Sequence, residues 1–352
     1  MKIIKRVIAV VLSLAVILIA VVAYLFRQEL RSLASWKKLD DYGLFQMTYY
    51  GDYGFDEFLK RGAENDGEIQ DFVTKRLLKG LPIKIDIVGG GCTVFMAKNE
   101  KGEIIFGRNF DFTYAPSLQL YTKPKNGYAS VSTVNLAFAG YGADNLPGGW
   151  DFHSFMTLAG PYLPFDGMNE KGVAIALLAV PQAQPGRAAD KVTLNTTTAI
   201  RLVLDKAADV QQAVELLKNY NIYFSGGIDC HYLIADRFGN SVLVEYWDGA
   251  LQTVTTLDDY QVASNFIAYN DLNLGEGYSE FERYDTVIKA LQSGKGVLTK
   301  SQATELLAEV GSYGENQEDK LQWTVLYDLT ELSGVIFAHR QINNQINFSL
   351  VP

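Results

Sequence analysis

The chain has 352 residues, 48% of them hydrophobic and 12% aromatic, so it is long and apolar enough to bury a sizeable core. Its formal net charge of -9 leaves no basic surface for phosphates, which argues against nucleic acid as a partner. It has only two cysteines and no paired Cys-x-x-Cys or His-Glu-x-x-His spacing, so we expect neither a disulfide scaffold nor a metal or cofactor site.

The N-terminal region predicts a membrane segment within residues 1–26. Val7 to Phe26 contains no charge and follows Lys2, Lys5 and Arg6. At about 1.5 Å per residue, a helix of this length spans the hydrocarbon core, which is about 30 Å thick. We favour an uncleaved single-pass anchor with the following domain on the extracytoplasmic side. The alternative is an export signal cleaved after Val21-Val22-Ala23 and a secreted protein.

Residues 27–91 are expected to form a helical pro-segment. Asp66 to Lys79 places apolar residues at nearly the i, i+3, i+4 spacing of an amphipathic helix. After Gly89-Gly90-Gly91 the pattern changes to short strands rich in Val, Ile, Phe and Tyr, separated by turns that contain glycine. The best domain boundary therefore lies at these glycines, with residues 92–352 as the second unit.

Three hairpins are predicted in this second unit. The turn Asn99-Glu-Lys-Gly102 recurs as Asn169-Glu-Lys-Gly172, and Asp236-Arg-Phe-Gly-Asn240 separates two further apolar runs. Helical periodicity and apolar runs then predict two helix pairs and three final strands: helices within 196–220, 281–291 and 301–310, and strands at 323–329, 334–340 and 345–351. Antiparallel strands with inserted helix pairs indicate an α+β fold, with helices on the outer faces of two stacked sheets.

The first hairpin brings a thiol close to charged side chains. With Asn99 to Gly102 as the turn, Cys92 lies across from Asn109, within one or two residues of register. Arg108 and Asp111 then lie at the same end of the hairpin. A neighbouring cation favours the reactive thiolate, and Asp111 would hold that arginine or accept a hydrogen bond from an ammonium group.

A base for this thiol is harder to identify. The histidines are His153, His231 and His339, and none stands in a recognisable motif. A Cys-His pair therefore has weak support, and Cys230-His231 resembles part of a buried strand. A Cys92 to Cys230 disulfide also stays possible in an exported domain. If the chain were cut between Gly91 and Cys92, the new α-amino group, with a pKa of ~8, would supply the base. The glycines would then provide unusual backbone conformations and an uncovered Gly91 carbonyl.

Four stretches, in this order, carry a family resemblance: Gly91-Cys92-Thr93, Gly107-Arg108-Asn109-Phe110-Asp111-Phe112, Gly167-Met168-Asn169-Glu170-Lys171-Gly172 and His231-Tyr232-Leu233-Ile234-Ala235-Asp236. Together they resemble the choloylglycine hydrolase family of N-terminal-nucleophile (Ntn) hydrolases. That family includes bile salt hydrolases, penicillin V acylases, N-acylethanolamine acid amidase and acid ceramidase. The resemblance runs from about Gly91 to near Val351.

The resemblance implies a four-layer αββα sandwich of two antiparallel sheets. It also implies self-cleavage before Cys92, which then attacks a linear, non-peptide amide and forms a thioester. Arg108 and Asp111 would orient the nucleophile and its amino group. Asn265 matches the asparagine of the oxyanion site. Arg283 matches the family's later arginine. From pattern alone, Asn265 would be a turn residue and Arg283 a surface charge.

Two departures from the family pattern concern the substrate. Leu178-Ala179-Val180-Pro181 stands where bile salt hydrolases and penicillin V acylases have Leu-Asn-aromatic-Pro, whose asparagine also serves the oxyanion site. The long pre-segment is more similar to the ceramidase and acylethanolamine amidase branch, which acts on the acyl chains of lipids. The aromatic stretches Phe110 to Tyr114 and Tyr162 to Phe165 would line an acyl pocket or simply belong to the core.

The function predicted from the sequence is a membrane-anchored or exported, self-processing cysteine amidohydrolase. Its partner would be a small N-acyl amide with an apolar, lipid-like acyl group. A bile salt hydrolase or penicillin V acylase is the alternative among enzymes. A surface-anchored binding protein that keeps the fold without catalysis is the alternative of another class.

Overall fold

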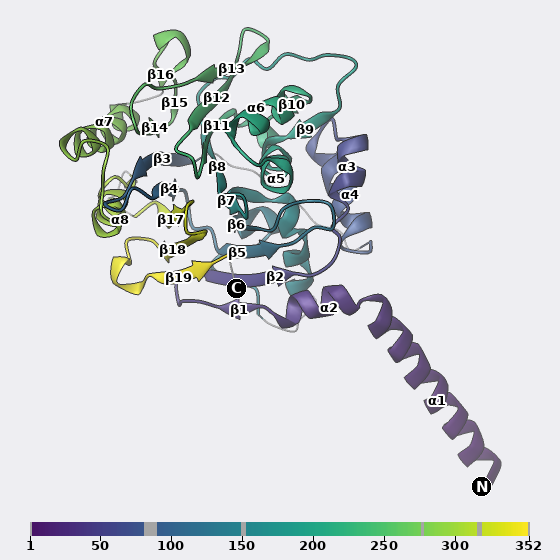
Figure 1. The fold of residues 1–352 in the computed structure, drawn as a ribbon. Helices are drawn as coiled ribbons and strands as arrows, with labels where there is room; N and C mark the ends of the chain where they lie inside the picture. The colour runs from purple at the N-terminus through teal and green to yellow at the C-terminus, as the bar shows by residue number, and fades with distance from the viewer. Residues whose placement is uncertain (1, 81–89, 149–152, 276–277, 315–318, 351–352) are drawn as a thin grey trace.

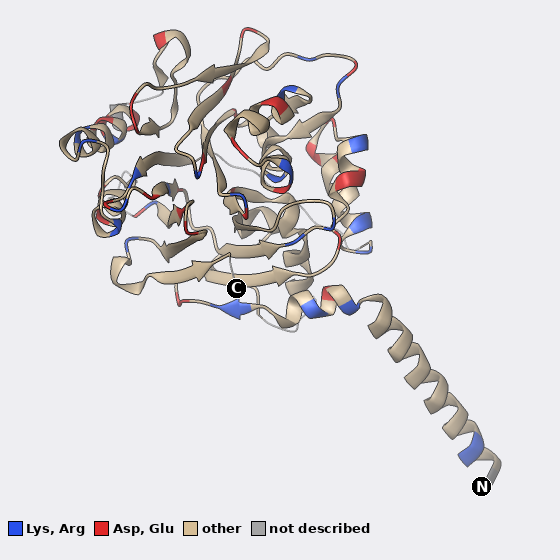
Figure 2. Cartoon of the chain, in the orientation of Figure 1, with Lys and Arg blue, Asp and Glu red and all other residues tan. Residues whose placement is uncertain are grey.

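The computed structural model describes residues 2–80, 90–148, 153–275, 278–314 and 319–350. Helix α1 (Lys2–Leu25) extends away from the rest of the molecule and contacts it only near its C-terminal end (Figure 1). Its Ile3–Leu25 stretch is unburied and is long and apolar enough to cross a membrane, a test that an export signal also passes. Figure 2 shows charge only at the N-terminal end of this helix. The predicted apolar N-terminal helix is therefore present.

The larger sheet has nine strands in the described part of the chain, in the order β1-β2-β5-β6-β7-β8-β11-β12-β13. These strands are β1 (Lys37–Lys38), β2 (Leu44–Tyr49), β5 (Ser117–Thr122), β6 (Ser130–Asn135), β7 (Pro164–Asn169), β8 (Val173–Ala179), β11 (Cys230–Asp236), β12 (Ser241–Trp247) and β13 (Ala250–Val254). Its neighbouring strands run antiparallel, apart from β2 and β5, which run parallel.

The second sheet has six antiparallel strands among the described residues, in the order β14-β3-β4-β17-β18-β19. They are β14 (Gln261–Ala263), β3 (Gly91–Lys98), β4 (Ile104–Asp111), β17 (Leu321–Asp328), β18 (Ser333–Ala338) and β19 (Ile346–Ser349). Two short pairs complete the described strands: β9 (Thr193–Asn195) with β10 (Asn221–Tyr223), and β15 (Phe266–Ile267) with β16 (Leu274–Gly275).

The layers follow the αββα order (Figure 1). Helices α5 (Thr196–Lys206) and α6 (Val210–Lys218) pack on the nine-stranded sheet. Helices α7 (Tyr278–Ser293) and α8 (Lys300–Glu309) pack on the six-stranded sheet, whose β3 contacts β8 and β11 of the larger one. The four-layer fold, the two helix pairs and the three final strands predicted from the sequence are confirmed.

Short 3-10 helices and two capping boxes complete the frame. The 3-10 helices are η1 (Leu136–Ala139), η2 (His153–Tyr162), η3 (Ser225–Gly227), η4 (Tyr269–Asp271) and η5 (Ile342–Asn344). Asn195 with Thr198 starts α5, and Thr299 with Gln302 starts α8, each through reciprocal side-chain and backbone hydrogen bonds.

The prediction that residues 27–91 are helical is only partly right. Helices α2 (Arg27–Ala34), α3 (Phe55–Arg61) and α4 (Asp66–Arg76) are present, but β1 and β2 lie between α2 and α3. In β2 the apolar residues Phe45, Met47 and Tyr49 alternate with Gln46 and Thr48, which are less buried. This period of two is a strand signal that the helical interpretation overlooked. Because β2 pairs with β5, the pre-segment supplies part of the larger sheet.

The register of the first hairpin differs by one residue from the prediction. Cys92 lies across from Phe110, not Asn109. The cause is the turn, in which Gly102 adopts a φ of 79° and Asn99 bonds through its backbone to Glu103, so the loop is one residue longer than assumed. The shift turns Asn109 away from the cysteine side chain.

Candidate active site

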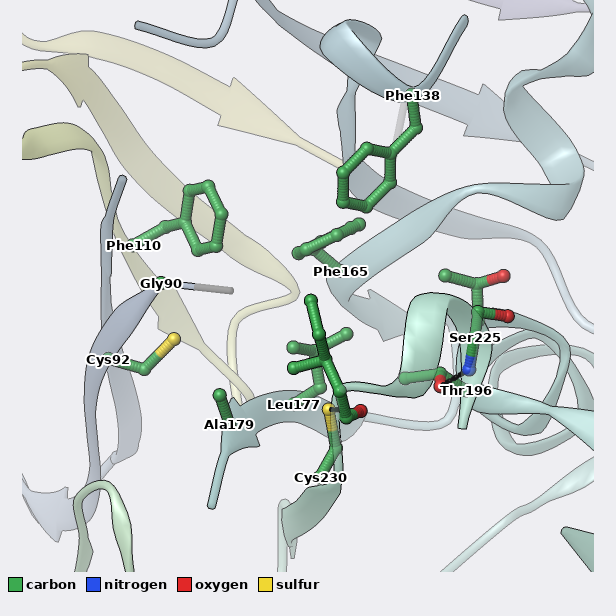
Figure 3. Close-up of a pocket in the computed structure, with 12 residues that line it drawn as sticks. Gly90, Cys92, Phe110, Phe138, Phe165, Leu177, Ala179, Thr196, Ser225 and Cys230 are labelled. Carbon is green, nitrogen blue, oxygen red and sulfur yellow. Dashed lines mark hydrogen bonds between the residues drawn. The ribbon is translucent and has the colours of Figure 1, made fainter. Parts of the chain in front are cut away.

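Cys92 is buried near the start of β3, and its side chain points into an apolar pocket (Figure 3). The pocket is small, with a cavity volume of about 30 Å³. Its walls come from both sheets, α5, η1, η3 and adjoining loops: Gly90, Cys92, Phe110, Phe138, Phe165, Leu177, Ala179, Thr196, Thr197, Ser225, Ile228 and Cys230. Phe110 and Phe165, from the two aromatic stretches singled out in the sequence, thus line the pocket, and Tyr162 packs in the core. Cys230 faces the same pocket, and both thiols are free, so the predicted alternative of a disulfide is not formed.

The backbone of Cys92 is held by side chains from two other segments. Its N–H donates to Asn265 Oδ1 at 2.7 Å. Its carbonyl accepts a hydrogen bond from Arg283 Nη1 at 2.7 Å and another from Ser264 Oγ at 3.3 Å. Asn265 and Arg283, which the residue pattern alone would have assigned to a turn and the surface, are buried against the cysteine.

Arg283 connects the other members of this group. It donates to Thr93 Oγ1 and to Asn265 Oδ1, both at 2.9 Å, and lies 3.5 Å from Asp111 Oδ2. The Asp111 carboxylate also accepts hydrogen bonds from the Ser312 N–H and Oγ, each at 3.0 Å. Asp111 therefore pairs with the arginine of α7. Of the two roles expected of Asp111, an ion pair with Arg108 is replaced by one with Arg283, and acceptance of a hydrogen bond from an ammonium group stays a prediction.

Arg108 lies in the interior on the pocket side of the hairpin, with no exposed surface. Its Nε is 2.9 Å from Asp166 Oδ2, and its Nη2 donates to the Leu177 carbonyl at 3.3 Å. Asp166 is fixed in turn by hydrogen bonds from Trp323 Nε1 and the Tyr327 hydroxyl. Sequence reasoning missed this carboxylate. An acidic residue at the start of an otherwise apolar strand was the available signal.

Asn109, which the predicted register placed beside the thiol, belongs to a different contact. Its Nδ2 donates to the Leu307 carbonyl of α8, and its Oδ1 accepts from Thr324 Oγ1. It therefore joins the hairpin to α8 and β17. Of the residues predicted for the site, Cys92, Asp111, Asn265 and Arg283 form one hydrogen-bonded and ion-paired group, and Arg108 acts on the thiol from the other side through its charge.

Burial raises the pKa of the Cys92 thiol above its ordinary value. The charge of Arg108 opposes this rise, Asp111 adds to it, and Arg283 and a backbone hydrogen bond from Ala179 again oppose it. Burial also raises the pKa of Asp111, although Arg283 and the two hydrogen bonds from Ser312 act in the opposite direction. In the uncut chain the thiol is thus neutral at rest, and the chemistry requires a base.

No histidine hydrogen bond in the described part of the chain reaches this thiol. His231 contacts Glu245 through Nδ1 and the Ser264 carbonyl through Nε2. His339 contacts the Leu321 carbonyl. The side chain of His153 lies outside the described residues. The sequence gives only weak support for a Cys-His pair, and these histidine contacts give it no further support.

The glycines before Cys92 have a steric role. Gly91 does not have a positive φ, so the expected unusual backbone conformation is wrong for this residue, and Gly89 lies outside the described residues. A Cβ on Gly90 would stand 2.5 Å from the Asp111 carbonyl oxygen, which is too close for any other residue. A Cβ on Gly91 would meet its nearest neighbours at 3.4 Å, an ordinary contact.

A second, more polar cavity adjoins the first and borders Gly90 and Gly91, the residues before Cys92. It shares Gly90, Ala179 and Ile228 with the apolar pocket. Its remaining walls include Gly91, Val180, Pro181, Gly227, Asp229, Asn265 and Glu280. An apolar cavity that contains the thiol and a cavity with two acidic residues therefore meet at Gly90 and Ala179.

Comparisons with known proteins identify the family of the chain. The family model for linear amide C–N hydrolases of the choloylglycine hydrolase family matches residues 92–306, which is more than half of the chain and begins at Cys92. No curated protein matches the chain.

Among solved structures, a mutant conjugated bile acid hydrolase from Clostridium perfringens has a TM-score of 0.53 at 17% identity, covering 73% of this chain and 92% of that one. Penicillin V acylase from Agrobacterium tumefaciens gives 0.48 at 17% identity, covering 70% and 83%. An N-acylethanolamine-hydrolyzing acid amidase ortholog from Caenorhabditis elegans gives 0.42 at 16%, covering 68% and 93%. Because the family model matches more than half of the chain, the chain belongs to the choloylglycine hydrolase family and is a hydrolase of C–N bonds in linear amides.

Proposed function

We propose that this protein is a self-processing cysteine amidohydrolase that cleaves a linear N-acyl amide, with Cys92 as the nucleophile. One observation carries the proposal: Asn265 and Arg283 hold the N–H and the carbonyl of Cys92, while the thiol faces an apolar pocket. The start of the family match at Cys92 supports the same residue as the first of the mature chain.

Self-cleavage begins with attack of Cys92 Sγ on the Gly91 carbonyl carbon. The peptide bond to the Cys92 nitrogen breaks, that nitrogen gains a proton, and water hydrolyses the resulting thioester. A Cβ on Gly91 would lie 3.5 Å from Asp111 Oδ2, so this carboxyl stands beside the bond that breaks. Because burial raises its pKa, Asp111 is suited to carry the proton to the nitrogen. The products are a Gly91 carboxylate and a free α-amino group on Cys92.

In the mature enzyme this α-amino group takes the proton of the thiol, since its ordinary pKa is ~8. The thiolate attacks the amide carbonyl of the substrate, and the amine leaves with a proton from the ammonium group. Water then hydrolyses the thioester and regenerates the thiol. Arg108 favours the thiolate through its charge.

Asn265 is the proposed oxyanion donor. One Nδ2 hydrogen goes to the Ala179 carbonyl at 2.7 Å, and an amide nitrogen carries a second hydrogen that is suited to the developing oxyanion. Arg283 fixes the side chain by donating to its Oδ1. Ala179 itself offers no side-chain amide, so the donor that related enzymes take from an asparagine there has no counterpart in this side chain.

The two cavities support a substrate with an apolar acyl group and an amine that is not anionic. Phe110, Phe165 and Leu177 suit the acyl chain. Asp229 and Glu280 line the other side, where they would repel a carboxylate or sulfonate on the amine. This favours acylethanolamine-like amides over conjugated bile salts, the alternative among enzymes. Hydrolysis of an N-acylethanolamine and of the N-acylglycine with the same acyl chain should be compared, and a preference for the N-acylglycine would contradict this choice.

The experiment that tests the central proposal is intact-mass analysis of the purified chain. Wild type should separate into two polypeptides that meet at Gly91 and Cys92, and Cys92→Ala should remain one chain. Cys230→Ala is the matched control, since it removes the other buried thiol of the same pocket, and it should still be cut. An uncut wild type, or cutting of Cys92→Ala at the same bond, would contradict self-cleavage. A protein that also hydrolyses no acyl amide would be the non-catalytic binding protein.

For the N-terminus we propose an uncleaved anchor formed by α1, with the hydrolase on the extracytoplasmic side. Arg27 and Arg31 in α2, with Lys37 and Lys38 in β1, place positive charge directly after the apolar helix (Figure 2). Lys2, Lys5 and Arg6 place similar positive charge before the helix, so the orientation is proposed from the long domain that follows it, because long domains translocate largely regardless of charge. Membrane fractionation and protease protection of intact cells test the proposal, and a soluble protein that begins after Ala23 would show a cleaved signal instead.

A further inference from the structure

A buried histidine and glutamate lie next to the site without contacting the thiol. His231 of β11 and Glu245 of β12 face each other across neighbouring strands, with His231 Nδ1 2.8 Å from Glu245 Oε1. Their side chains are 1% and 0% exposed. No step proposed above uses either residue, although ionisable groups buried this deeply are uncommon unless they have a role.

The pair holds both ends of the segment that carries Asn265. At one end, His231 Nε2 lies 2.9 Å from the Ser264 carbonyl. At the other end, Glu245 accepts hydrogen bonds from the N–H of Ala268 at 3.0 Å and of Tyr269 at 2.8 Å. Asn265, whose side chain contacts the Cys92 N–H, lies between these two points. The position of the proposed oxyanion donor therefore depends on the His231 and Glu245 contacts.

Ser264 adds a second connection to the nucleophile. Its hydroxyl donates to the Cys92 carbonyl at 3.3 Å, so the residue whose backbone carbonyl contacts His231 also touches the cysteine. A movement of Ser264 would disturb the contacts of Asn265 and Cys92 together.

Both ring nitrogens of His231 lie within hydrogen-bond distance of an oxygen, one of the Glu245 carboxylate and the other of the Ser264 carbonyl. Burial acts to raise the pKa of Glu245, but the hydrogen bond and charge of His231 and the N–H groups of Ala268 and Tyr269 lower it below its ordinary value. Glu245 is therefore a buried carboxylate whose oxygens are all used as acceptors.

A further cavity borders the His231 ring. The adjacent cavity, between β12, β14 and α7, is lined by the titratable residues Asp258, Tyr260 and Tyr284. It has no lysine or arginine among its described lining residues. The neighbouring residues on β11 are Cys230 and Tyr232. Cys230 faces the apolar pocket, and the Tyr232 hydroxyl bonds to the first residue of α5.

We infer that His231 is a positioning residue of the hydrolase: its ring bridges Glu245 and the Ser264 carbonyl and keeps Asn265 against Cys92. When the ring is removed, the Ser264 carbonyl and Glu245 both lose this contact, and Asn265 is no longer fixed. The inference rests on the proposed role of Asn265.

The kinetics of hydrolysis test this inference. His231→Gln should lower kcat about tenfold or more, with KM little changed, because the acyl pocket is untouched while Asn265 is displaced. Glu245→Gln leaves one oxygen acceptor in place of two, so kcat should fall in the same direction with KM again little changed. His339→Gln, the same change at a histidine outside the site, should keep the wild-type kcat. Wild-type kcat in both His231→Gln and Glu245→Gln would overturn the inference.

Nitrogen-15 NMR of the imidazole rings gives a readout that does not depend on activity. The chain has 3 histidines, so the His231→Gln spectrum assigns the signals of His231. Both of its ring nitrogens should show the chemical shifts of hydrogen-bonded nitrogens, and a ring nitrogen without a hydrogen bond would overturn the inference even if the enzyme is active. If no acyl amide is hydrolysed, the proposed function is wrong, and these signals still decide whether His231 makes its two contacts.

Discussion

Two of the buried arginine–aspartate pairs in the described part of the molecule have the same chemistry and different surroundings. Arg283 of α7 meets Asp111 at the end of β4, with 3.5 Å between Nη1 and Oδ2. Arg201 and Asp205 lie one turn apart on α5, with 3.3 Å between Nη1 and Oδ1. The pair Arg283 and Asp111 lies beside the peptide bond that is proposed to break. The pair Arg201 and Asp205 comes more than 90 residues after that bond in the sequence.

The two arginines differ in the acceptors to which their remaining guanidinium N–H groups donate. Arg283 donates to the Cys92 carbonyl and to Asn265. Arg201 donates to the Pro161 carbonyl and to buried hydroxyls of the larger sheet: Thr122, Ser130 and Ser132. Asp205 accepts the hydroxyl of Tyr53 with both oxygens, at 2.8 and 2.7 Å, and thereby joins the pre-segment to the core. A buried charge pair is thus used once to position reacting groups and once to fasten two parts of the fold.

The largest expected effect comes from breaking the pair at the site. Arg283→Gln removes the donor to the Cys92 carbonyl and the support of Asn265, so we expect self-cleavage and kcat/KM to fall about 10³-fold or more. The protein should still fold, because Asp111, whose pKa burial already raises, can take up a proton when its partner is lost. Intact-mass time courses and substrate assays measure the loss. Arg237→Gln, on a surface turn, is the control, and near-normal cleavage by Arg283→Gln would contradict the assigned role.

Breaking the other pair should affect stability and spare the chemistry. Arg201→Gln leaves Asp205 and several hydroxyls with fewer partners, and we expect a loss of about 3–5 kcal/mol in the free energy of unfolding. Urea titration followed by tryptophan fluorescence measures it. The kcat of the protein that remains folded should stay within about twofold of wild type. An unchanged unfolding midpoint would show that the Arg201 network is not stabilising.

The pH dependence of stability sharpens the contrast. Burial raises the pKa of Asp205 to about 6, against the effects of Arg201 and Tyr53. A carboxyl whose pKa is higher in the folded state contributes most below its unfolded pKa, near 4, and loses that contribution as pH rises through about 6. Because of this group, we expect the free energy of unfolding to fall by at most about 3 kcal/mol as the pH rises from 4 to 7. Asp205→Asn should flatten this part of the stability curve, and a slope equal to that of wild type would contradict the assignment.

The smallest effect is expected from the contact that joins the pre-segment. Tyr53→Phe removes a hydrogen bond to a charged group, worth about 1.5 kcal/mol, and keeps the packing of the ring. After cleavage it should weaken retention of residues 27–91 by roughly tenfold, measured by dilution and size-exclusion chromatography. Tyr42→Phe, which alters an exposed ring of the same segment, is the control. Equal retention in both variants would show that the Tyr53 bond does not hold the fragments together.

Much of the fold could be predicted because its elements carry local signals. The recurrent Asn-Glu-Lys-Gly turns identified two hairpins, and helical periodicity identified α5 to α8. The register of the first hairpin could not be predicted to the residue, because it depends on the positive φ of Gly102. Strand β2 was missed although Phe45, Met47 and Tyr49 alternate, since it lies between segments with helical patterns.

The site could be predicted only in part, for a different reason. Cys92, Arg108 and Asp111 are linked by one hairpin, so local sequence relates them. Asn265 and Arg283 reach Cys92 across more than 170 residues of sequence, and only the resemblance to a family pointed to them. The partners Asp166 and Glu245 are related to their basic residues by tertiary contacts, for which the sequence gives no spacing rule.

The parallel pairing of β2 with β5 has a consequence for anyone who produces the hydrolase without its first 91 residues. In that shorter protein β5 would become the edge of the larger sheet and would present a row of unpaired N–H and carbonyl groups. Its side chains Leu118 and Leu120, now fully covered, would lose part of their cover. An exposed edge strand can pair with a strand of another molecule, so we expect the shorter protein to aggregate. Recombinant work on the mature form should therefore begin from the whole extramembrane chain and let the cut occur after folding.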